Sequence, residues 1–456
     1  MLAKLWADGG HDAAALASID LTGAEPVLPS SFAVGSALQA SVAAAALAAA
    51  EIWRERSGRR QRVGVDMRAA AIAGRSEHYL AIDGTPIAES RDKIAGTYQC
   101  GDGRWVRLHT NFPHHRDGVL AILQCAYDQA AVADALRGWK ALDLEEACAQ
   151  AGLVVTAMRT FAEWDAHPQG AAISRLPLLS VERIGDAPPP RWPAGDRPLA
   201  GIKVLDLTRV IAGPVCGLTL AAHGADVMLV TSPHLPSIKP LAIDTGRGKL
   251  STHIDLRQPA GRTALEALLR EADVLVQGYR PGALAALGFG PQDAARIRPG
   301  IVYVSLCAYG HAGPWAGRRG FDSLVQTASG FNAAEAEAAG IASPKPLPAQ
   351  ALDHGTGYLL AYGAMTALKR RAREDGSWHV RGALAQTGFW LRSLGRIDGR
   401  RCKEPTRDEV RDCLEDSASG FGRLSAVRHA ATMSETPPYW ARPSVPLGTH
   451  PPAWPA

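Results

Sequence analysis

The chain has 456 residues, of which 46% are hydrophobic and 21% are charged, and these values exclude a disordered or fibrous protein. At roughly 100–200 residues per domain, the length predicts two or three domains. The 49 basic and 45 acidic side chains leave a formal net charge of +4. This balance argues against a nucleic-acid binder, which needs a dense basic face, and gives little support for binding to a membrane surface.

The first clear element is a long apolar helix. Residues 35–56 are mostly Ala, Leu, Val and Ile, and Ser57-Gly58 follows as a stop signal. The most apolar run, residues 41–50, is too short to span a bilayer. We therefore expect a helix of the protein core and no membrane partner.

Shorter elements follow this helix. We expect a strand at 62–67, a helix at 69–79, a hairpin at 96–111 and Ala/Leu-rich helices within 117–151. The hairpin is indicated by the turn sequence Gly101-Asp102-Gly103 between two apolar runs. His109, His114 and His115 form a cluster, but a metal site would need further ligands at defined positions. A solvated loop and no metal are predicted there.

A proline-rich segment at residues 185–198 cannot form a continuous helix or a central strand. We interpret it as an extended linker. It separates an N-terminal part, residues 1–184, from a C-terminal part that begins at Leu199.

The C-terminal part has a βαβ pattern. We expect strands at 202–207, 225–230, 273–277 and 301–306, and helices at 215–223 and 260–271. Alternating strands and helices predict an α/β fold with an open, mostly parallel, Rossmann-like sheet, here combined with a smaller α+β domain. The first turn, Thr208 to Pro214, lacks the GxGxxG pattern, which argues against a standard dinucleotide site.

A weak internal repeat links the two parts of the chain. An Ala-rich helix, an Arg-x-Arg pair, a short strand and a second helix occur at residues 35–79 and recur at 356–394, with Val63 corresponding to Val380. This order favours a duplication.

The seven cysteines are widely spaced and form no CxxC pair. Reduced thiols are expected, and with them a cytoplasmic protein, because the N-terminus shows no signal-peptide pattern.

The C-terminal part carries a series of short motifs. They are Pro198-Leu-Ala-Gly-Ile-Lys-Val-Leu-Asp-Leu-Thr-Arg-Val-Ile-Ala-Gly-Pro214, His223-Gly-Ala-Asp-Val227, Arg247-Gly-Lys249, Arg280-Pro-Gly-Ala-Leu284, Pro299-Gly-Ile-Val-Tyr303 and Gly313-Pro-Trp-Ala-Gly317. In this order they resemble the class III CoA-transferases, the family of formyl-CoA and carnitine CoA-transferases that also includes alpha-methylacyl-CoA racemase. The resemblance implies a Rossmann-like fold, coenzyme A as a substrate and a homodimer. Family dimers are interlocked, but that threading depends on domain order, which differs in this chain, so an active site within one chain and one shared across a dimer both stay open.

The N-terminal part resembles the same family in a different order. Residues 56–67 are similar to the segment that follows the family's catalytic helix, and residues 96–106 to the start of its small domain. A circular permutation and a tandem duplication both fit, and the repeat favours the duplication. The implied division is a small domain with a degenerate linker-helix copy at 1–184, the linker at 185–198, a CoA-binding domain at 199–345, a catalytic linker-helix region at 346–400 and a tail at 401–456.

The resemblance implies that Asp353 is the catalytic carboxylate, at the start of the linker helix. A carboxylate there can attack an acyl-CoA thioester, and free N–H groups at a helix start favour the developing negative charge. The alternative is that Asp353 only caps the helix. The corresponding position of the first copy, near Ser36, has no carboxylate, so that copy is expected to be inactive.

Five further residues match family positions near CoA. Arg209, Val210 and Ala212 lie in the loop after the first strand, Arg319 matches a basic residue near the phosphates, and Tyr279 matches an aromatic residue near the adenine. The alternatives are turn packing for Val210 and Ala212, a surface arginine for Arg319 and a core aromatic for Tyr279. The chain also departs from the family pattern, with Leu229-Val-Thr231 in place of Lys-x-Glu and Gly278 in place of an asparagine.

The predicted function is transfer of CoA from an acyl-CoA to a carboxylic acid through an aspartyl anhydride and thioester. One alternative is another acyl-CoA enzyme on this fold, a lyase, a hydrolase or a racemase. Phe321 occupies the position of a racemase histidine and cannot move protons, so racemase activity is disfavoured. The other alternative is a non-catalytic CoA-binding subunit.

Overall fold

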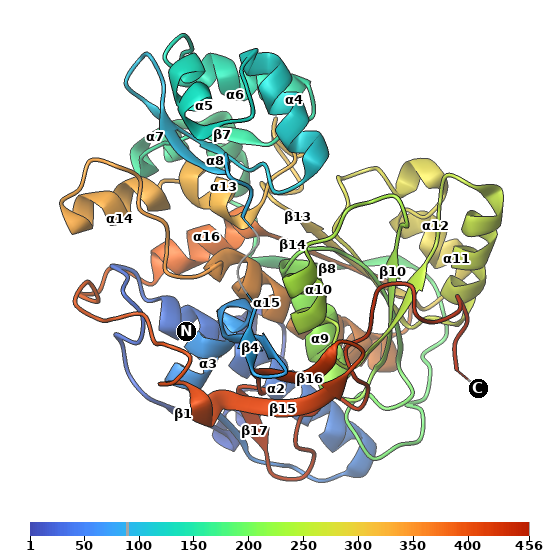
Figure 1. The fold of residues 1–456 in the computed structure, drawn as a ribbon. Helices are drawn as coiled ribbons and strands as arrows, with labels where there is room; N and C mark the ends of the chain where they lie inside the picture. Colours follow the sequence, from blue (N-terminus) through green and yellow to red (C-terminus); the bar gives the residue numbers. More distant parts are fainter. Residues whose placement is uncertain (88–90, 456) are drawn as a thin grey trace.

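A seven-stranded sheet forms the centre of the computed structural model, which describes residues 1–87 and 91–455 (Figure 1). In spatial order its strands are β11 (Lys249–His253), β10 (Asp226–Thr231), β9 (Lys203–Leu207), β12 (Val274–Gln277), β13 (Val302–Cys307), β14 (Ser377–Ala383) and β8 (Leu179–Gly185). All neighbours pair in parallel except β8, which is antiparallel to β14. The strand order reverses between β9 and β12, and ligands of open α/β sheets bind at the carboxyl ends beside such a switch.

Helices cover both faces of this sheet, and the alternation of side chains along the strands shows why. Val204 and Val274 belong to the core that includes α9 (Ala212–Ala222) and α15 (Ala351–Glu374). Leu205 and Leu275, one residue further along, belong to a second core with α11 (Pro259–Glu271) and α12 (Pro291–Ile297). Successive strand residues point to opposite faces, so near-continuous apolar strands bury both faces.

The helix α9 is buried along its whole length between the sheet and α15. The two helices approach closely at Gly357, where an added Cβ atom would lie 2.5 Å from the carbonyl oxygen of Ala212. This glycine therefore places the first turns of α15 directly against the start of α9.

The first 87 residues share the same core. They form α1 (Leu2–Asp8), η1 (Ala13–Ser18), β1 (Ile19–Thr22), α2 (Val34–Ser57), β2 (Val63–Asp66), α3 (Met67–Ala73), η2 (Ser76–Tyr79), β3 (Ala81–Ile82) and β4 (Thr85–Pro86). The helix α2 packs along α15. This helix extends well beyond residues 41–50, and by length and composition it is apolar enough to cross a membrane. However, 94% of its most apolar window is buried inside the protein.

Two segments of the chain fold alike. The segment α2–β2–α3 corresponds to α15–β14–α16, where α16 is Leu384–Ser393. The helix starts Val34 and Ala351 are separated by the same distance in sequence as the helix starts Met67 and Leu384. The strand β2 is parallel to β1 and antiparallel to β17 (Ala431–Met433), just as β14 is parallel to β13 and antiparallel to β8. The internal repeat is thus present in the fold as well as in the sequence.

A smaller core lies apart from the main one, at the top of Figure 1. It is built from β5 (Gly96–Gln99), β6 (Trp105–Leu108), β7 (Val155–Ala157), α4 (Pro113–Leu123), α5 (Gln129–Leu136) and α6 (Ala141–Gln150). Two short helices, α7 (Phe161–Ala166) and α8 (Pro168–Ile173), lead from it to β8. Residues 186–198 contain no helix or strand, as the proline-rich composition predicts.

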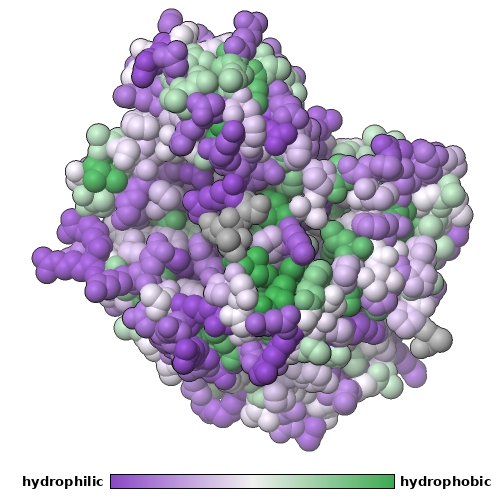
Figure 2. Space-filling model, viewed as in Figure 1, coloured by the Kyte–Doolittle hydropathy of each residue, from purple (hydrophilic) through white to green (hydrophobic). Residues whose placement is uncertain are grey.

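The remaining elements lie between the strands of the main sheet in sequence or belong to the C-terminal tail. They are α10 (Lys239–Thr245), η3 (Ala285–Leu287), α13 (Asp322–Ala328), α14 (Phe331–Ala339), η4 (Arg411–Cys413), β15 (Leu414–Ser419) and β16 (Gly422–Val427). Strands β15 and β16 extend the β3–β4 hairpin into a four-stranded sheet. Over the region of α10, apolar side chains gather on the surface (Figure 2).

The predicted α/β fold with its mostly parallel sheet is confirmed, as are the hairpin at 96–111 and the four strands of the C-terminal part. All seven cysteines are free. The domain boundaries at 184, 198, 345 and 400 stay predictions.

Candidate active site

The carboxylate of Asp322 caps the first turn of α15. One of its oxygens, Oδ2, accepts hydrogen bonds from the backbone N–H groups of Leu352 and Asp353, at 2.8 and 2.9 Å. The other oxygen accepts a short bond from Gln326. Since Asp322 satisfies these N–H groups, the alternative in which Asp353 is only the cap of this helix is excluded.

The side chain of Asp353 is therefore left for another role. Asp353 is 7% exposed, and its carboxylate accepts no hydrogen bond from any residue in the described part of the chain. It lines a cavity of about 340 Å³. A buried carboxylate with no hydrogen-bonding partner needs an explanation, and a ligand that enters this cavity would supply one.

Two neighbouring carboxylates act on Asp353 electrostatically. Burial, together with the negative charges of Asp322 and Glu77, raises the pKa of Asp353 well above its ordinary value. Burial also raises the pKa of Asp322 to about 6, although its hydrogen bonds from backbone and side-chain N–H groups oppose the shift. Perturbed carboxylates that share a cavity are a common property of catalytic sites.

The cavity lies at the carboxyl ends of the parallel strands, where the order reverses. The structure brings all six predicted site residues to its wall, namely Arg209, Val210, Ala212, Tyr279, Arg319 and Asp353. They come from the loop after β9, the loop after β12, the loop before α13 and the first turn of α15. Their roles stay predictions, but their convergence on one cavity is a fact of the fold.

The loop after β9 shows local backbone strain. Val210 has φ = +72°, in the left-handed region that a β-branched residue rarely adopts. Such a conformation costs of order 1–3 kcal/mol and persists where the surroundings impose it, often at a ligand site. The loop is held by Arg209, whose guanidinium lies over the ring of Phe112 and donates a short bond to the carbonyl of Pro236.

Four arginines border the same cavity, and one of them, Arg318, pairs with Glu146. Arg209, Arg280 and Arg319 all line it, and none of them forms an ion pair with a carboxylate of the described residues. The mutual repulsion of Arg280 and Arg319 adds to burial in lowering the pKa of Arg319. Unpaired guanidinium groups that converge on a cavity favour binding of an anion such as a phosphate. Arg280 is not among the predicted contacts, although it lies within one of the motifs quoted above.

The predicted solvated loop is wrong for His109 and His115, whereas His114 is exposed as expected. His109 stacks on Phe321 with ring centroids 3.9 Å apart, and His115 is 3% exposed. The helix α4 begins at Pro113, and Phe112, His114 and His115 form a wall of the cavity. Burial lowers the pKa of His115 to about 3, so its ring is neutral at physiological pH. The signal in the sequence was Phe112-Pro113, an apolar residue followed by a favoured first residue of a helix.

No group of three or more His, Cys, Asp or Glu side chains in the described residues is arranged to hold a metal ion. The three histidines instead pack with Phe112 and Phe321.

Comparison with known proteins agrees with this site. Residues 199–410 match the model of CoA-transferase family III. This part of the chain is similar to the class III CoA-transferases. It contains Asp353 and the loops that form the floor of the cavity.

Curated relatives support the same assignment. An acetyl-coenzyme A transferase of Hypoxylon pulicicidum is 34% identical over 269 residues, which cover 56% of this chain and 45% of the relative. The succinyl-CoA:glutarate CoA-transferase of Homo sapiens is 34% identical over 147 residues, or 30% of this chain and 34% of the relative. The chain therefore spans about half or less of the length of these relatives.

Among solved structures, a protein of Mycobacterium tuberculosis is 32% identical, with a TM-score of 0.41, and the match covers 43% of this chain and 56% of the other. A CAIB/BAIF family protein of Brucella suis is 26% identical, with a TM-score of 0.38, over 50% of this chain and 65% of the other.

Proposed function

We propose that this protein transfers CoA from an acyl-CoA to a carboxylic acid, with Asp353 as the nucleophile. The observation that carries the proposal is that the Asp353 carboxylate faces a cavity bordered by unpaired arginines while Asp322 caps the helix in its place. The family assignment of residues 199–410 supports the same chemistry.

The reaction proceeds through four successive nucleophilic attacks. The Asp353 carboxylate attacks the thioester carbonyl, the C–S bond breaks, and CoA leaves as a thiolate with a mixed anhydride on the enzyme. The thiolate attacks the aspartyl carbonyl and releases the donor acid, which leaves an aspartyl-CoA thioester. The acceptor carboxylate attacks this thioester to form a second anhydride, and the thiolate then takes the new acyl group and restores Asp353. Covalent catalysis of this kind divides one difficult exchange into easier steps.

The nucleotide end of CoA has a place beside the catalytic cavity. A second cavity of about 300 Å³ lies at the ends of β10 and β11 and shares Tyr279, Leu207 and Leu235 with the first. His234 and Arg257 line it. Both side chains pair with Asp255 at the wall of this cavity, and we infer that Tyr279 contacts the adenine.

One chain is sufficient to close this site. The helix α4 and its histidines come from the N-terminal part, whereas Asp353 and the arginines come from the C-terminal part. We propose that the site is complete in a single chain. The homodimer and the cytoplasmic location stay predictions, and light scattering of the purified protein tests the first of them.

The decisive experiment compares wild type with Asp353→Ala in a transferase assay with a panel of acyl-CoAs and acids. Hydroxylamine should trap an acyl-enzyme in the wild type and none in the variant. Full transfer by the Asp353→Ala variant would refute the mechanism. Deuterium exchange at the acyl α-carbon would indicate a racemase or lyase instead, release of free acid without an acceptor would indicate a hydrolase, and binding of CoA without turnover would indicate a non-catalytic subunit.

A further inference from the structure

The residue that follows the proposed nucleophile, His354, is held by a carboxylate from the other part of the chain. Nε2 of His354 lies 3.0 Å from Oε2 of Glu77, and the two side chains are 2% and 7% exposed. Glu77 belongs to η2. The second ring nitrogen of His354 has no hydrogen-bond partner in the described part of the chain, so Glu77 provides the polar anchor of this side chain.

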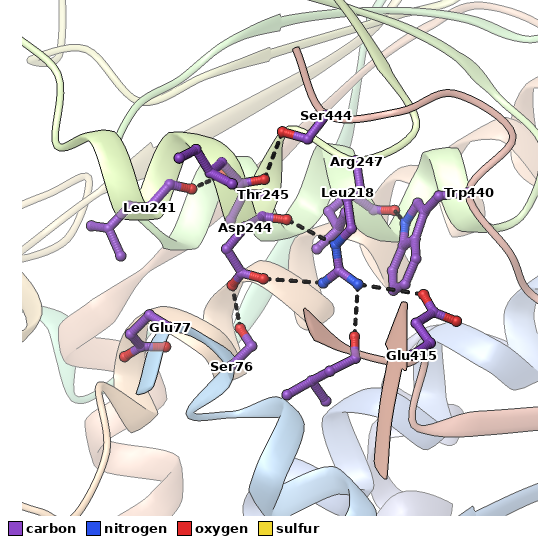
Figure 3. A network of polar contacts seen from close by, with 12 residues as sticks. Ser76, Glu77, Leu218, Leu241, Asp244, Thr245, Arg247, Glu415, Trp440 and Ser444 are labelled. Atoms are coloured by element: carbon purple, nitrogen blue, oxygen red, sulfur yellow. Dashed lines mark hydrogen bonds and ion pairs between the residues drawn. The ribbon is translucent and has the colours of Figure 1, made fainter. Parts of the chain in front are cut away.

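A polar network that runs from Ser76 to the C-terminal tail holds η2 in place (Figure 3). The hydroxyl of Ser76, next to Glu77, donates to Asp244 at 2.5 Å, and Asp244 pairs with Arg247 at 3.1 Å. Arg247 donates to the carbonyl of Val427 and lies over the ring of Trp440, 4.0 Å from its centroid. Strand β16 and the C-terminal tail thus hold the segment that presents Glu77.

The charges around Asp353 come from several elements. Glu77 on η2, Asp322 on α13 and Asp244 on α10 are acidic, His354 lies on α15 itself, and the guanidinium of Arg107 on β6 faces Asp322. Burial alone would lower the pKa of His354, but the carboxylate of Glu77 raises it.

The repulsion between carboxylates has a chemical consequence. When Asp353 is acylated, its carboxylate becomes an uncharged anhydride or thioester, so the repulsion from Glu77 and Asp322 is relieved. Charge crowding that exists only in the ground state favours acylation.

The first copy of the helix, α2, lacks both the nucleophile and the histidine. At the start of α2, Ser36 stands at the position of Asp353 and Ala37 at that of His354. The cap itself is retained, because Glu25 accepts a hydrogen bond from the N–H of Ser36 at 2.7 Å. A helix in this position therefore needs a capping carboxylate but no histidine.

We propose that Glu77 is a positioning residue for Asp353 that acts through His354. It fixes the first turn of α15 and keeps a negative charge beside the nucleophile. The proposal rests on the proposed function, because it assumes that Asp353 attacks the thioester.

The test is Glu77→Gln, which retains the shape of the side chain and can still bond to His354. Attack requires ionised Asp353, so the rate rises as pH rises through the pKa of Asp353. Removal of the charge at position 77 lowers that pKa, and the acidic limb of the pH–rate profile should move to lower pH. Loss of the ground-state repulsion between positions 77 and 353 should reduce kcat by about tenfold, with little change in KM for the acyl-CoA.

The matched control is Glu145→Gln, which breaks the equally buried pair of Glu145 with Arg159 in the smaller core, away from Asp353. It should reduce thermal stability without moving the acidic limb. His354→Gln is the second variant, and it should also reduce kcat.

An unchanged pH profile and kcat in Glu77→Gln would overturn the proposal, and so would the same profile change in Glu145→Gln. If Glu77→Gln fails to fold, a folded His354→Gln variant with wild-type kcat would overturn it instead. Absence of any trapped acyl-enzyme in the wild type would instead refute the proposed function, so the two failures are distinguishable.

Discussion

The helices α2 and α15 have the same length, the same kind of start and the same elements after them, and of the two it is α15 that begins at the cavity described above. The start of α2 is covered by its own preceding segment. An added Cβ atom at Gly35 would lie 2.3 Å from Val27, and Glu25 reaches the N–H of Ser36. At the start of α15, the corresponding space is bordered by the loops after β9 and β12. A helix start of this kind has a structural role by itself. It becomes part of a site where the loops of the parallel sheet lie beside it.

The largest expected effect separates the two copies at equivalent positions. Asp353→Ala should abolish transfer, because among the described residues that line the cavity Asp353 provides the carboxylate. Ser36→Ala should leave kcat unchanged within about twofold, in keeping with a surface or structural substitution. Steady-state assays of both variants check this, and a strong loss in Ser36→Ala would show that the first copy also contributes chemistry.

A second pair tests the caps. Asp322→Ala and Glu25→Ala should each cost about 0.5–2 kcal/mol of stability, since each removes a carboxylate from a helix N-terminus. Only Asp322→Ala should also reduce kcat, because its carboxylate orients the N–H of Asp353. Denaturant unfolding and transferase assays on the same samples give both quantities. Equal kcat values in Asp322→Ala and Glu25→Ala would contradict the proposed difference between the two helix starts.

A smaller effect is expected where α15 meets α9. Gly357→Ala would place a methyl group 2.5 Å from the carbonyl of Ala212, which must shift, and overpacking of this kind costs about 1–3 kcal/mol. Because Ala212 belongs to the predicted CoA loop, KM for CoA esters should rise. Gly355→Ala is the control, since its nearest neighbour is a methyl group of Thr387 at 3.3 Å. A KM increase that is equal in both variants would contradict the proposed link.

The smallest effect concerns pH and stability. The folded-state pKa of Asp353 is raised above its unfolded value, so the native state binds the proton more tightly and loses stability as pH rises between these two values. Asp353→Asn removes the penalty. The variant should melt a few degrees higher than wild type at pH 8, and the difference should vanish near pH 4. Thermal unfolding at both pH values decides the matter, and a lower Tm of the variant at pH 8 would contradict the raised pKa.

The sequence predicted those parts of the fold that depend on local pattern. The run of small apolar residues in 35–56 predicted α2, and Gly101-Asp102-Gly103 predicted the β5–β6 hairpin, because helix composition and turn chemistry act over a few residues. The six candidate site residues came from resemblance. Their convergence could be expected because loops at the carboxyl ends of parallel strands meet.

The parts that could not be predicted depend on contacts between distant segments. Whether Asp353 is a cap or a free carboxylate depends on Asp322, which is the first residue of a separate helix, α13. Glu77 reaches His354 only because α2 and α15 pack together. The burial of His109 and His115 follows from Phe321, more than 200 residues later in the chain. No local pattern contains this information.

The presence of both helix copies on one chain has an evolutionary consequence. In a symmetric homodimer each substitution appears twice, so a residue that benefits one subunit is imposed on the other. Here Ser36 and Asp353, or Ala37 and His354, can change separately. The two helix starts accordingly differ: α2 carries Ser36 and Ala37, whereas α15 carries Asp353 and a histidine with a fixed partner in Glu77. Asymmetry of this kind is accessible to a single chain and not to a symmetric homodimer.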